Sequence, residues 1–158
     1  MQGIASLSSP IYAGQGALQD GAVGTLYTDS DANDILFITA NTESHEAKTY
    51  SGVGIGRAVV GSFTEAGKTQ IAYADGSIYE YQPLFDRFDA VQGFAVEIAS
   101  GLMATTDVDG DGLDDVISHW HGSVACFSGA DFGLVWEHEV DISLQVLNNY
   151  AKLASAGQ

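Results

Sequence analysis

The sequence predicts an all-β protein built from short antiparallel strands, and three observations support this fold class. The 158 residues include 19 glycines but only 2 prolines. Short runs of β-branched and aromatic residues alternate with glycine-containing turns, a pattern typical of strands rather than long helices. A polar turn followed by a β-rich run also recurs along the chain. With 46% hydrophobic residues, the chain has enough apolar side chains for the core of one domain.

The recurring unit aligns without gaps at three places, which start at residues 26, 62 and 107. Each copy has an apolar second residue, a polar turn and a β-rich run. Units of this length that hold about four short strands are typical of β-propeller blades. We therefore expect a single domain over residues 1–158, with β-propeller-like repeat units at approximately 20–56, 57–100 and 101–141.

Two other all-β architectures fit this pattern less well. An antiparallel sandwich would not require the same loop to recur, and a β-solenoid would usually show a shorter and stricter period. Three units are too few to close a propeller, which typically has roughly four to eight blades. Because open sheet edges expose unpaired backbone groups, we expect the blades to be open or completed by oligomerisation. Extra terminal strands or a larger parent protein are the alternatives.

The expected strands follow the hydrophobic pattern along the chain. They lie at residues 9–13, 35–38, 47–50, 71–74, 75–81, 116–119, 121–127 and 133–140. Leu134, Trp136 and His138 share one face of the last strand, because side chains alternate along a strand. The first and last of these strands are candidates for closing the repeat array.

The C-terminal segment 142–158 has two interpretations. Residues 142–153 fit an amphipathic helix, with Leu144, Leu147, Tyr150 and Leu153 at helical spacing. The same residues also fit the start of one more blade. The sequence does not decide between them.

The acidic run at 107–116 is the strongest functional signal. It places carboxylates at alternate positions around two glycines. Ca²⁺ takes roughly six to eight oxygen ligands at about 2.3–2.6 Å, and alternate side chains of a tight turn can converge on one ion. The spacing predicts a calcium site whose ligands are Asp107, Asp109, Asp111, the backbone carbonyl of Leu113, and Asp115.

An EF-hand loop begins with the same spacing but ends on a bidentate Glu. Ser118 occupies that position here, and residues 116–118 favour a strand over a helix. The loop is therefore expected to join two β-strands. The alternative is an acidic turn that binds no metal, although carboxylates held this close repel one another unless a cation neutralises them.

This loop, together with Gly-Ser-Val at 122–124 and Phe-Ser-Gly at 127–129, resembles the FG-GAP (VCBS-like) repeat of integrin α-subunit propellers and many secreted bacterial proteins. The resemblance covers approximately residues 20–140. It implies blades in which calcium lies in the hairpin between the first two strands. Residues 62–68 keep the shape of the turn without its Asp ligands, and the acidic residues at 29–34 are out of register with those at 107–115.

The charge of the chain restricts its partners and setting. Five basic and 21 acidic residues give a net charge of −16. Such a surface repels nucleic acid and anionic membranes, and it suits divalent cations, cationic partners or a high-salt habitat. No segment approaches the roughly 20 apolar residues that span a membrane, and no signal peptide is visible. We expect an extracellular or cell-surface location and no membrane insertion.

Catalytic patterns are weak, and we expect no enzyme activity. His119 and His121 would lie on one side of a strand and offer two zinc ligands, but a strand end with solvated histidines explains them equally. Cys126, the single cysteine, has no evident activating base and fits a small buried side chain. The glycine-rich segment 52–57 lacks a βαβ context and fits a link between repeats.

The sequence therefore predicts a calcium-binding, non-enzymatic module for binding, adhesion or assembly, with a protein or glycan partner and self-association. Tyr79, Tyr81, Phe85 and Phe88 are candidates for stacking on sugars, although core packing explains them more simply. Two alternatives remain open. One is a carbohydrate-active enzyme or accessory domain of a secreted protein, and the other is a self-assembling subunit of an extracellular fibre or coat.

Overall fold

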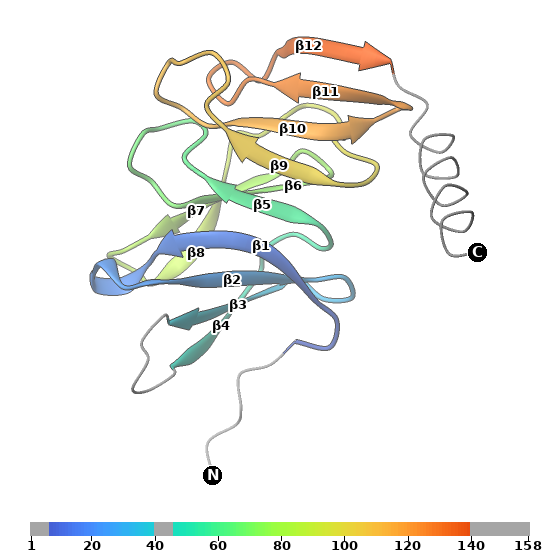
Figure 1. Cartoon of the computed structure of the whole chain (residues 1–158). Coiled ribbons are helices and arrows are strands. Elements are labelled where there is room, and N and C mark those ends of the chain that lie inside the picture. The colour runs from blue at the N-terminus through green and yellow to red at the C-terminus, as the bar shows by residue number, and fades with distance from the viewer. Residues whose placement is uncertain (1–6, 40–45, 140–158) are drawn as a thin grey trace, which may run out of the picture.

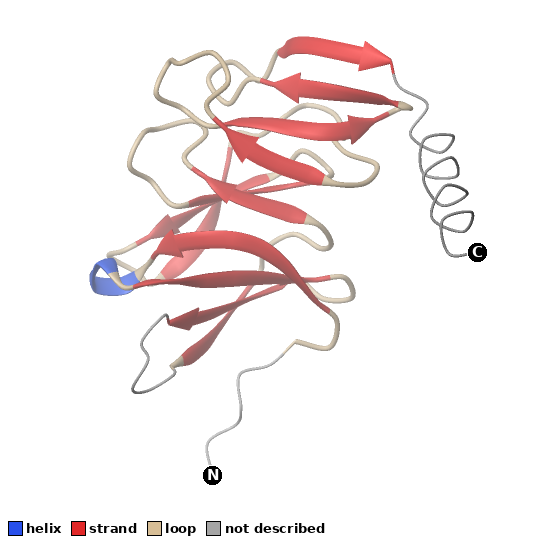
Figure 2. Cartoon of the chain, in the orientation of Figure 1, coloured by secondary structure: helices blue, strands red, loops and turns tan. Residues whose placement is uncertain are grey.

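The computed structural model describes residues 7–39 and 46–139 and confirms the all-β prediction (Figures 1 and 2). These residues form three four-stranded antiparallel sheets, in which strands adjacent in sequence are paired. The first sheet contains β1 (Pro10–Ala17), β2 (Val23–Asp29), β3 (Asp34–Thr39) and β4 (Ala47–Ser51), with the 3-10 turn η1 (Gln19–Gly21) after β1. The second sheet contains β5 (Ala58–Gly61), β6 (Gln70–Tyr73), β7 (Ile78–Gln82) and β8 (Arg87–Val91). The third sheet contains β9 (Met103–Thr106), β10 (Asp115–Trp120), β11 (Ser123–Phe127) and β12 (Leu134–Glu139).

The three sheets radiate from a row formed by their first strands. β5 contacts both β1 and β9, and the three strands run in the same direction (Figure 1). From this row the third sheet extends upward in the view, the first sheet extends downward, and the second recedes from the viewer. The first turns of the second and third sheets therefore lie at the same end of the molecule.

Two hydrophobic clusters hold the sheets together. The first cluster lies between the first and second sheets and includes Leu26, Phe37, Ile71 and Tyr73. The second cluster joins the second and third sheets. It contains Val59, Phe63, Ala72, Ile78, Phe94, Ile98, Val116, Ala125 and Phe127. The second sheet thus has both faces covered, which is why every residue of β6 is buried.

The three gapless copies of the recurring unit do not occupy equivalent places. The turns at 62–69 and 107–114 join the first two strands of their sheets, whereas the turn at 30–33 joins the second and third strands of the first sheet. Figure 1 shows that turn at the opposite end of the molecule. The similarity of the first copy reflects turn chemistry alone, because a short polar turn before a β-branched run occurs at either end of a sheet. The first turn of the first sheet is instead the short η1 segment.

The predicted terminal strands are integral parts of the sheets rather than additional closing strands. Residues 10–13 of the expected first strand belong to β1, and 134–139 form β12. The first sheet therefore begins at Pro10, ahead of the repeat boundary expected near residue 20. The predicted helix at 142–153 lies outside the described residues.

The glycine-rich segment 52–57 is the link between the first two sheets, as predicted. It is packed in place. Val53 is buried, and the Gly56 N–H donates to the Asp29 carbonyl oxygen at 2.8 Å. Gly54 lies so close to the Tyr73 ring that a Cβ there would approach it to 2.7 Å.

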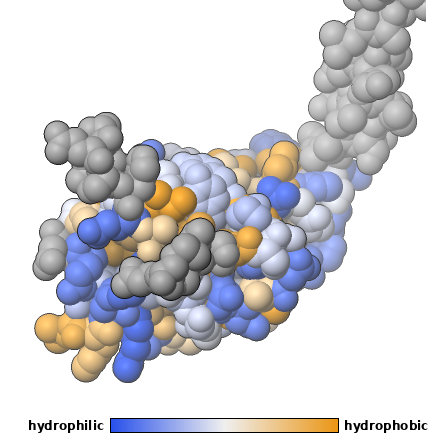
Figure 3. Space-filling model, turned by 90° about the horizontal axis from the view of Figure 1, so that it is seen from below, coloured by the Kyte–Doolittle hydropathy of each residue, from blue (hydrophilic) through white to orange (hydrophobic). Residues whose placement is uncertain are grey.

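The aromatic group at 79–88 is mainly core. Tyr81 and Phe88 are buried in the first cluster, and Tyr79 packs against it. Phe85 is 64% exposed, with the Arg87 guanidinium over its ring. The view from below the first sheet shows scattered hydrophobic patches among hydrophilic side chains (Figure 3). Within the described ranges, no helix is long and apolar enough to span a bilayer.

Candidate metal centre

The turn between β9 and β10 is shaped by two glycines and one aspartate. Gly110 and Gly112 have φ of 77° and 90°, a left-handed conformation that side chains with a Cβ rarely adopt. Their N–H groups donate to the two carboxylate oxygens of Asp107, at 2.8 and 2.9 Å. Asp107 therefore closes the turn upon itself.

Two further aspartates accept bonds from the backbone two residues ahead. Asp109 Oδ1 accepts the Asp111 N–H at 3.1 Å, and Asp111 Oδ1 accepts the Leu113 N–H at 2.8 Å. Such local bonds are typical of aspartate in turns. They leave further lone pairs on each carboxylate, because an ionised carboxylate has about four acceptor positions.

Asp115 stands at the start of β10 and is fully buried. Its Oδ2 accepts the Val108 N–H at 2.8 Å, and its Oδ1 accepts the Gly129 N–H at 3.1 Å. The ion pairs of the described residues involve Asp86 and Asp89, not Asp115. A carboxylate in this position has backbone donors but lacks a cationic partner within the described part of the chain.

Asp107, Asp109 and Asp115 each offer a carboxylate oxygen, and these oxygens lie within 4.8 Å of one another. Over residues 7–39 and 46–139, this is the one group of three or more acidic, His or Cys side chains so arranged. Two ligands at about 2.3–2.6 Å from one ion lie up to about 5 Å apart, so the spacing fits Ca²⁺. The donor set also fits, because hard cations prefer oxygen.

Three of the five predicted ligands are thus brought together. Asp111 lies outside the group, and its Oδ1 accepts the Leu113 N–H. No contact of the Leu113 carbonyl oxygen defines its part in the site. Asp107, Asp109 and Asp115 are the residues that would hold a metal, and the ion would supply the positive charge that they lack.

The electrostatics of the turn show mutual repulsion. The Asp111 N–H bond by itself lowers the pKa of the Asp109 carboxyl, but desolvation and the charges of Asp111 and Asp115 outweigh it and raise that pKa. A raised carboxyl pKa means that the folded turn disfavours the charged form. A bound cation would reverse this preference.

Asp114 fastens the turn to the second sheet. Its Oδ2 accepts the Ser62 N–H at 2.8 Å, and its own N–H donates to the Ser62 carbonyl oxygen at 2.8 Å. Gly129 fits beneath this contact, where a Cβ would lie 2.1 Å from the Asp114 carbonyl oxygen. Local sequence patterns do not reveal these roles, since the Ser62 bond joins residues 52 positions apart.

The acidic turn at 30–33 is organised differently. Asp29 is buried, and its carboxylate accepts the Asp31 N–H at 2.8 Å and the Ser8 N–H at 3.1 Å. The Asn33 side chain donates to the Val53 carbonyl oxygen. These groups close a turn against the segment that follows β4. Among the described residues, no group of three or more possible metal ligands occurs in this turn.

The histidine and cysteine candidates have other places. β10 ends at Trp120, and His121 adopts a left-handed φ of 47° in the following turn, so the expected alternation with His119 on one strand is wrong. Cys126 is buried and free, as predicted. Burial, with smaller contributions from Asp115 and Asp109, raises the pKa of its thiol to about 11, which disfavours a reactive thiolate.

A second polar cluster joins the first two sheets at Asp86. The hydroxyls of Tyr50 and Tyr81 donate to Asp86 Oδ1 at 2.8 and 2.6 Å, and Lys48 pairs with Oδ2. A cavity of about 350 Å³ lies beside this cluster. Its charged and phenolic groups already bond to one another, so the cluster ties the two sheets together.

Comparison with family models, curated proteins and solved structures gives no significant match for this chain. The resemblance to FG-GAP repeats therefore rests on the acidic turn and the short motifs that follow it.

Proposed function

We propose that this chain is a calcium-binding, non-enzymatic module for binding or assembly, in which Ca²⁺ stiffens the junction between the second and third sheets. One observation carries the proposal. The turn that brings three carboxylates within 4.8 Å of one another is also the turn that Asp114 bonds to Ser62 of the neighbouring sheet. Metal bound in the turn would therefore order the third-sheet side of that contact.

A structural role follows from the position of the ligands. Asp115 begins a central strand of the third sheet and is buried, while Asp107 and Asp109 are exposed in the turn. An ion that joins them would link the exposed turn to the strand end. Because calcium would bind the folded turn only, it would stabilise the fold by about 2.7 kcal/mol at a free concentration 100-fold above Kd.

The sheet arrangement supports a propeller-like architecture of the FG-GAP type. Each sheet is a four-stranded meander, and the three radiate from a row of first strands (Figure 1), as propeller blades do. The turn at 107–114 joins the first two strands of its sheet, which is where the resemblance to FG-GAP repeats locates calcium. An extracellular or cell-surface setting fits this proposal, since calcium sites of extracellular modules have Kd values of roughly 10⁻⁴–10⁻³ M.

Calorimetric titration of chelator-stripped protein with calcium tests the proposal. We expect about one calcium ion per chain, and we expect Asp109→Ala to weaken binding at least about tenfold, because it removes one of three clustered carboxylates. Asp31→Ala is the matched control. It removes the same charge from the other acidic turn, where the Asp31 side chain is exposed.

The control variant should bind calcium as the wild type does. Absence of binding at millimolar calcium would overturn the proposal. Equal weakening in both variants would show that overall charge, rather than the turn, attracts the ion.

A further inference from the structure

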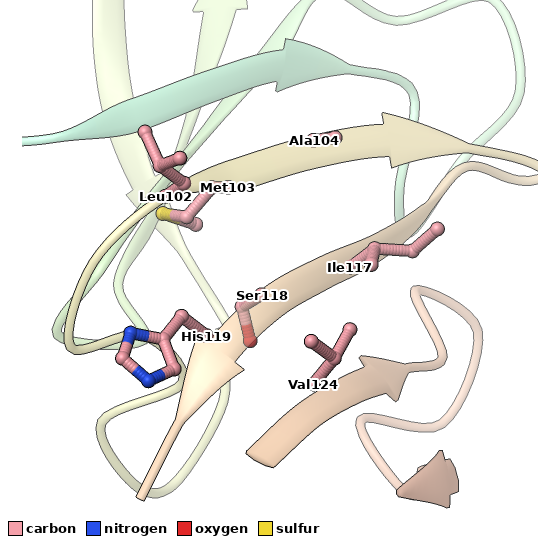
Figure 4. Close-up of a pocket in the computed structure, with 7 residues that line it drawn as sticks. All are labelled: Leu102, Met103, Ala104, Ile117, Ser118, His119 and Val124. Atoms are coloured by element: carbon pink, nitrogen blue, oxygen red, sulfur yellow. The ribbon is translucent and has the colours of Figure 1, made fainter. Parts of the chain in front are cut away.

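The third sheet has an apolar outer face that no described element covers. Residues paired across antiparallel strands lie on the same face, and the pairs Ile117–Ala104 and His119–Val124 lie opposite the face that contributes Val116 to the core. A groove of about 430 Å³ runs along this face (Figure 4). Leu102, at its rim, is 72% exposed.

This face matches the one that the second sheet buries. Ala72 is the third residue of β6 and pairs with Val59, just as Ile117 is the third residue of β10 and pairs with Ala104. In the second sheet both residues are buried against the third sheet. In the third sheet, Ala104 is exposed and Ile117 is half-buried. The third sheet therefore presents the kind of surface that its neighbour uses to hold another sheet.

The first sheet has a complementary outer face. Tyr12 pairs with Tyr27, and their rings form an edge-to-face contact with centroids 5.8 Å apart. The adjacent residues Ala13 and Leu26 belong to the core, so the two tyrosines lie on the opposite face. Tyr12 is 58% exposed. A projecting aromatic pair on one terminal sheet thus complements an apolar groove on the other.

The two outer faces lie on the same side of the molecule. In Figure 1 the first and third sheets diverge from the common row of first strands, with the second sheet behind them. Their covered faces point toward the second sheet, so their outer faces point toward the viewer. One second copy, related by a two-fold axis parallel to the first strands, can therefore engage both faces at once.

The charge of these faces also favours a second copy. The chain has 21 acidic residues, yet Leu102, Ala104, Ile117 and Val124 on one face and Tyr12 and Tyr27 on the other carry none. Interface cores are depleted of charged residues because charges lose hydration there. Asp115, which shares the Ile117 face of β10, is already buried at the end of this face beside the turn at 107–114. Two copies with a net charge of −16 each can therefore associate through the residues named above without burying further carboxylates.

We propose that a second copy of this chain docks the outer face of its first sheet on the outer face of the third sheet, so that two copies close one ring of six sheets. The inference rests on the proposed role as an assembly module, and it names the partner. Six sheets fall within the roughly four to eight blades of known propellers. Under the two-fold axis the contact between a first sheet and a third sheet occurs twice, so the interface as a whole is isologous.

Sedimentation equilibrium on the full chain tests this arrangement in calcium. The wild type is expected at twice the 16.6 kDa of one chain. Leu102→Asp on the third sheet and Tyr12→Asp on the first sheet should each weaken association at least about tenfold, because each places a charge in an apolar contact. Leu84→Asp is the matched control, since Leu84 is 91% exposed in the turn after β7, away from both faces.

Mixing the two variants distinguishes a contact between first and third sheets from a contact between two third sheets. The pair formed by Leu102→Asp and Tyr12→Asp chains retains one intact contact, so the mixture should associate more strongly than either variant alone. If the third sheet paired with itself, Tyr12→Asp would dimerise as the wild type does, and the proposal would be wrong. A monomeric wild type would also overturn the proposal. If, in addition, Leu102→Asp lowered the melting temperature of that monomer, another part of the same chain would be the occupant of the groove.

Calcium titration and circular dichroism of the same variants separate this inference from the proposed metal site. Variants that bind calcium and keep their strand spectrum but lose association support the ring. A wild type that binds calcium as a monomer would retain the metal site and eliminate the ring. A dimer that binds no calcium would support the ring and eliminate the metal site.

Discussion

The turns at 62–69 and 107–114 occupy the same place in neighbouring sheets but are closed by different chemistry. In the second sheet, Gln70 Oε1 accepts the N–H groups of Phe63 and Thr64 at 2.8 and 3.0 Å. Its Nε2 donates to Thr64 Oγ1 and Glu80 Oε1. In the third sheet, Asp115 holds the corresponding first position of the second strand and accepts two N–H groups.

This difference contrasts a position closed by a neutral amide with an equivalent position closed by a carboxylate. An amide has both donors and acceptors, so the protein alone can satisfy Gln70 without any net charge. A carboxylate has acceptors only and brings a negative charge, which here lies beside two further carboxylates. The second turn is therefore closed by a neutral side chain, whereas we propose that a cation completes the third.

Removing the residue that closes each turn should have the largest effect. Asp115→Ala leaves the N–H groups of Val108 and Gly129 without an acceptor, and Gln70→Ala does the same to two N–H groups in its turn. An unsatisfied buried donor costs about 1–3 kcal/mol. One of the two donors is buried in each turn, the Gly129 N–H or the Phe63 N–H. Each variant should therefore lose about 1–3 kcal/mol of unfolding free energy, measured by urea denaturation in calcium. Calcium should still stabilise Gln70→Ala but not Asp115→Ala, and an equal response of both would break the comparison.

An intermediate effect is expected from Asp109→Asn, which keeps the size of the side chain and removes its charge. In chelator the variant should melt slightly above the wild type, because the folded turn disfavours the charged form of Asp109. In saturating calcium it should melt below the wild type, because one ligand is weakened. Thermal unfolding under both conditions measures this reversal. A variant that melts below the wild type in chelator as well would show that the repulsion in the turn is unimportant.

The sequence predicted the parts of this comparison that depend on local spacing. Alternate carboxylates in a tight turn converge because the backbone bends at Gly110 and Gly112, and Asp107, Asp109 and Asp115 are grouped for that reason. Eight of the twelve described strands coincide with apolar runs that predicted a strand, whereas β2, β5, β8 and β9 were not predicted. Ligand spacing and apolar runs depend on residues close together in sequence, so they can be recognised without knowledge of the fold.

The remaining features depend on contacts between distant residues. The bond between Ser62 and Asp114 exists only because two sheets pack together, and Gly129 is constrained only by the backbone that it contacts there. The first copy of the recurring unit, at 26–35, was misplaced because its local sequence pattern is similar while its position in the sheet is not. The turn after Asp29 has a local sequence pattern like that of the other two, a polar turn before a β-rich run, but strand order places it at the other end of its sheet.

The smallest effect concerns the ionisation of the two acidic turns, which should differ in sign. The Asp31 N–H bond, aided by Ser8 and opposed by desolvation, lowers the pKa of Asp29, whereas the pKa of Asp109 is raised. As pH falls, Asp29 loses its stabilising contribution below its ordinary value of 3.8. Asp109 is protonated at higher pH, and protonation relieves its repulsion in the folded state.

Carboxyl carbon NMR titration in chelator should therefore give a lower pKa for Asp29 than for Asp109. Calcium should lower the apparent pKa of Asp109 and leave that of Asp29 unchanged, because only the turn at 107–114 gathers its carboxylates around a common point. Equal shifts at both residues would mean that calcium acts through general screening and that the two turns are not chemically distinct.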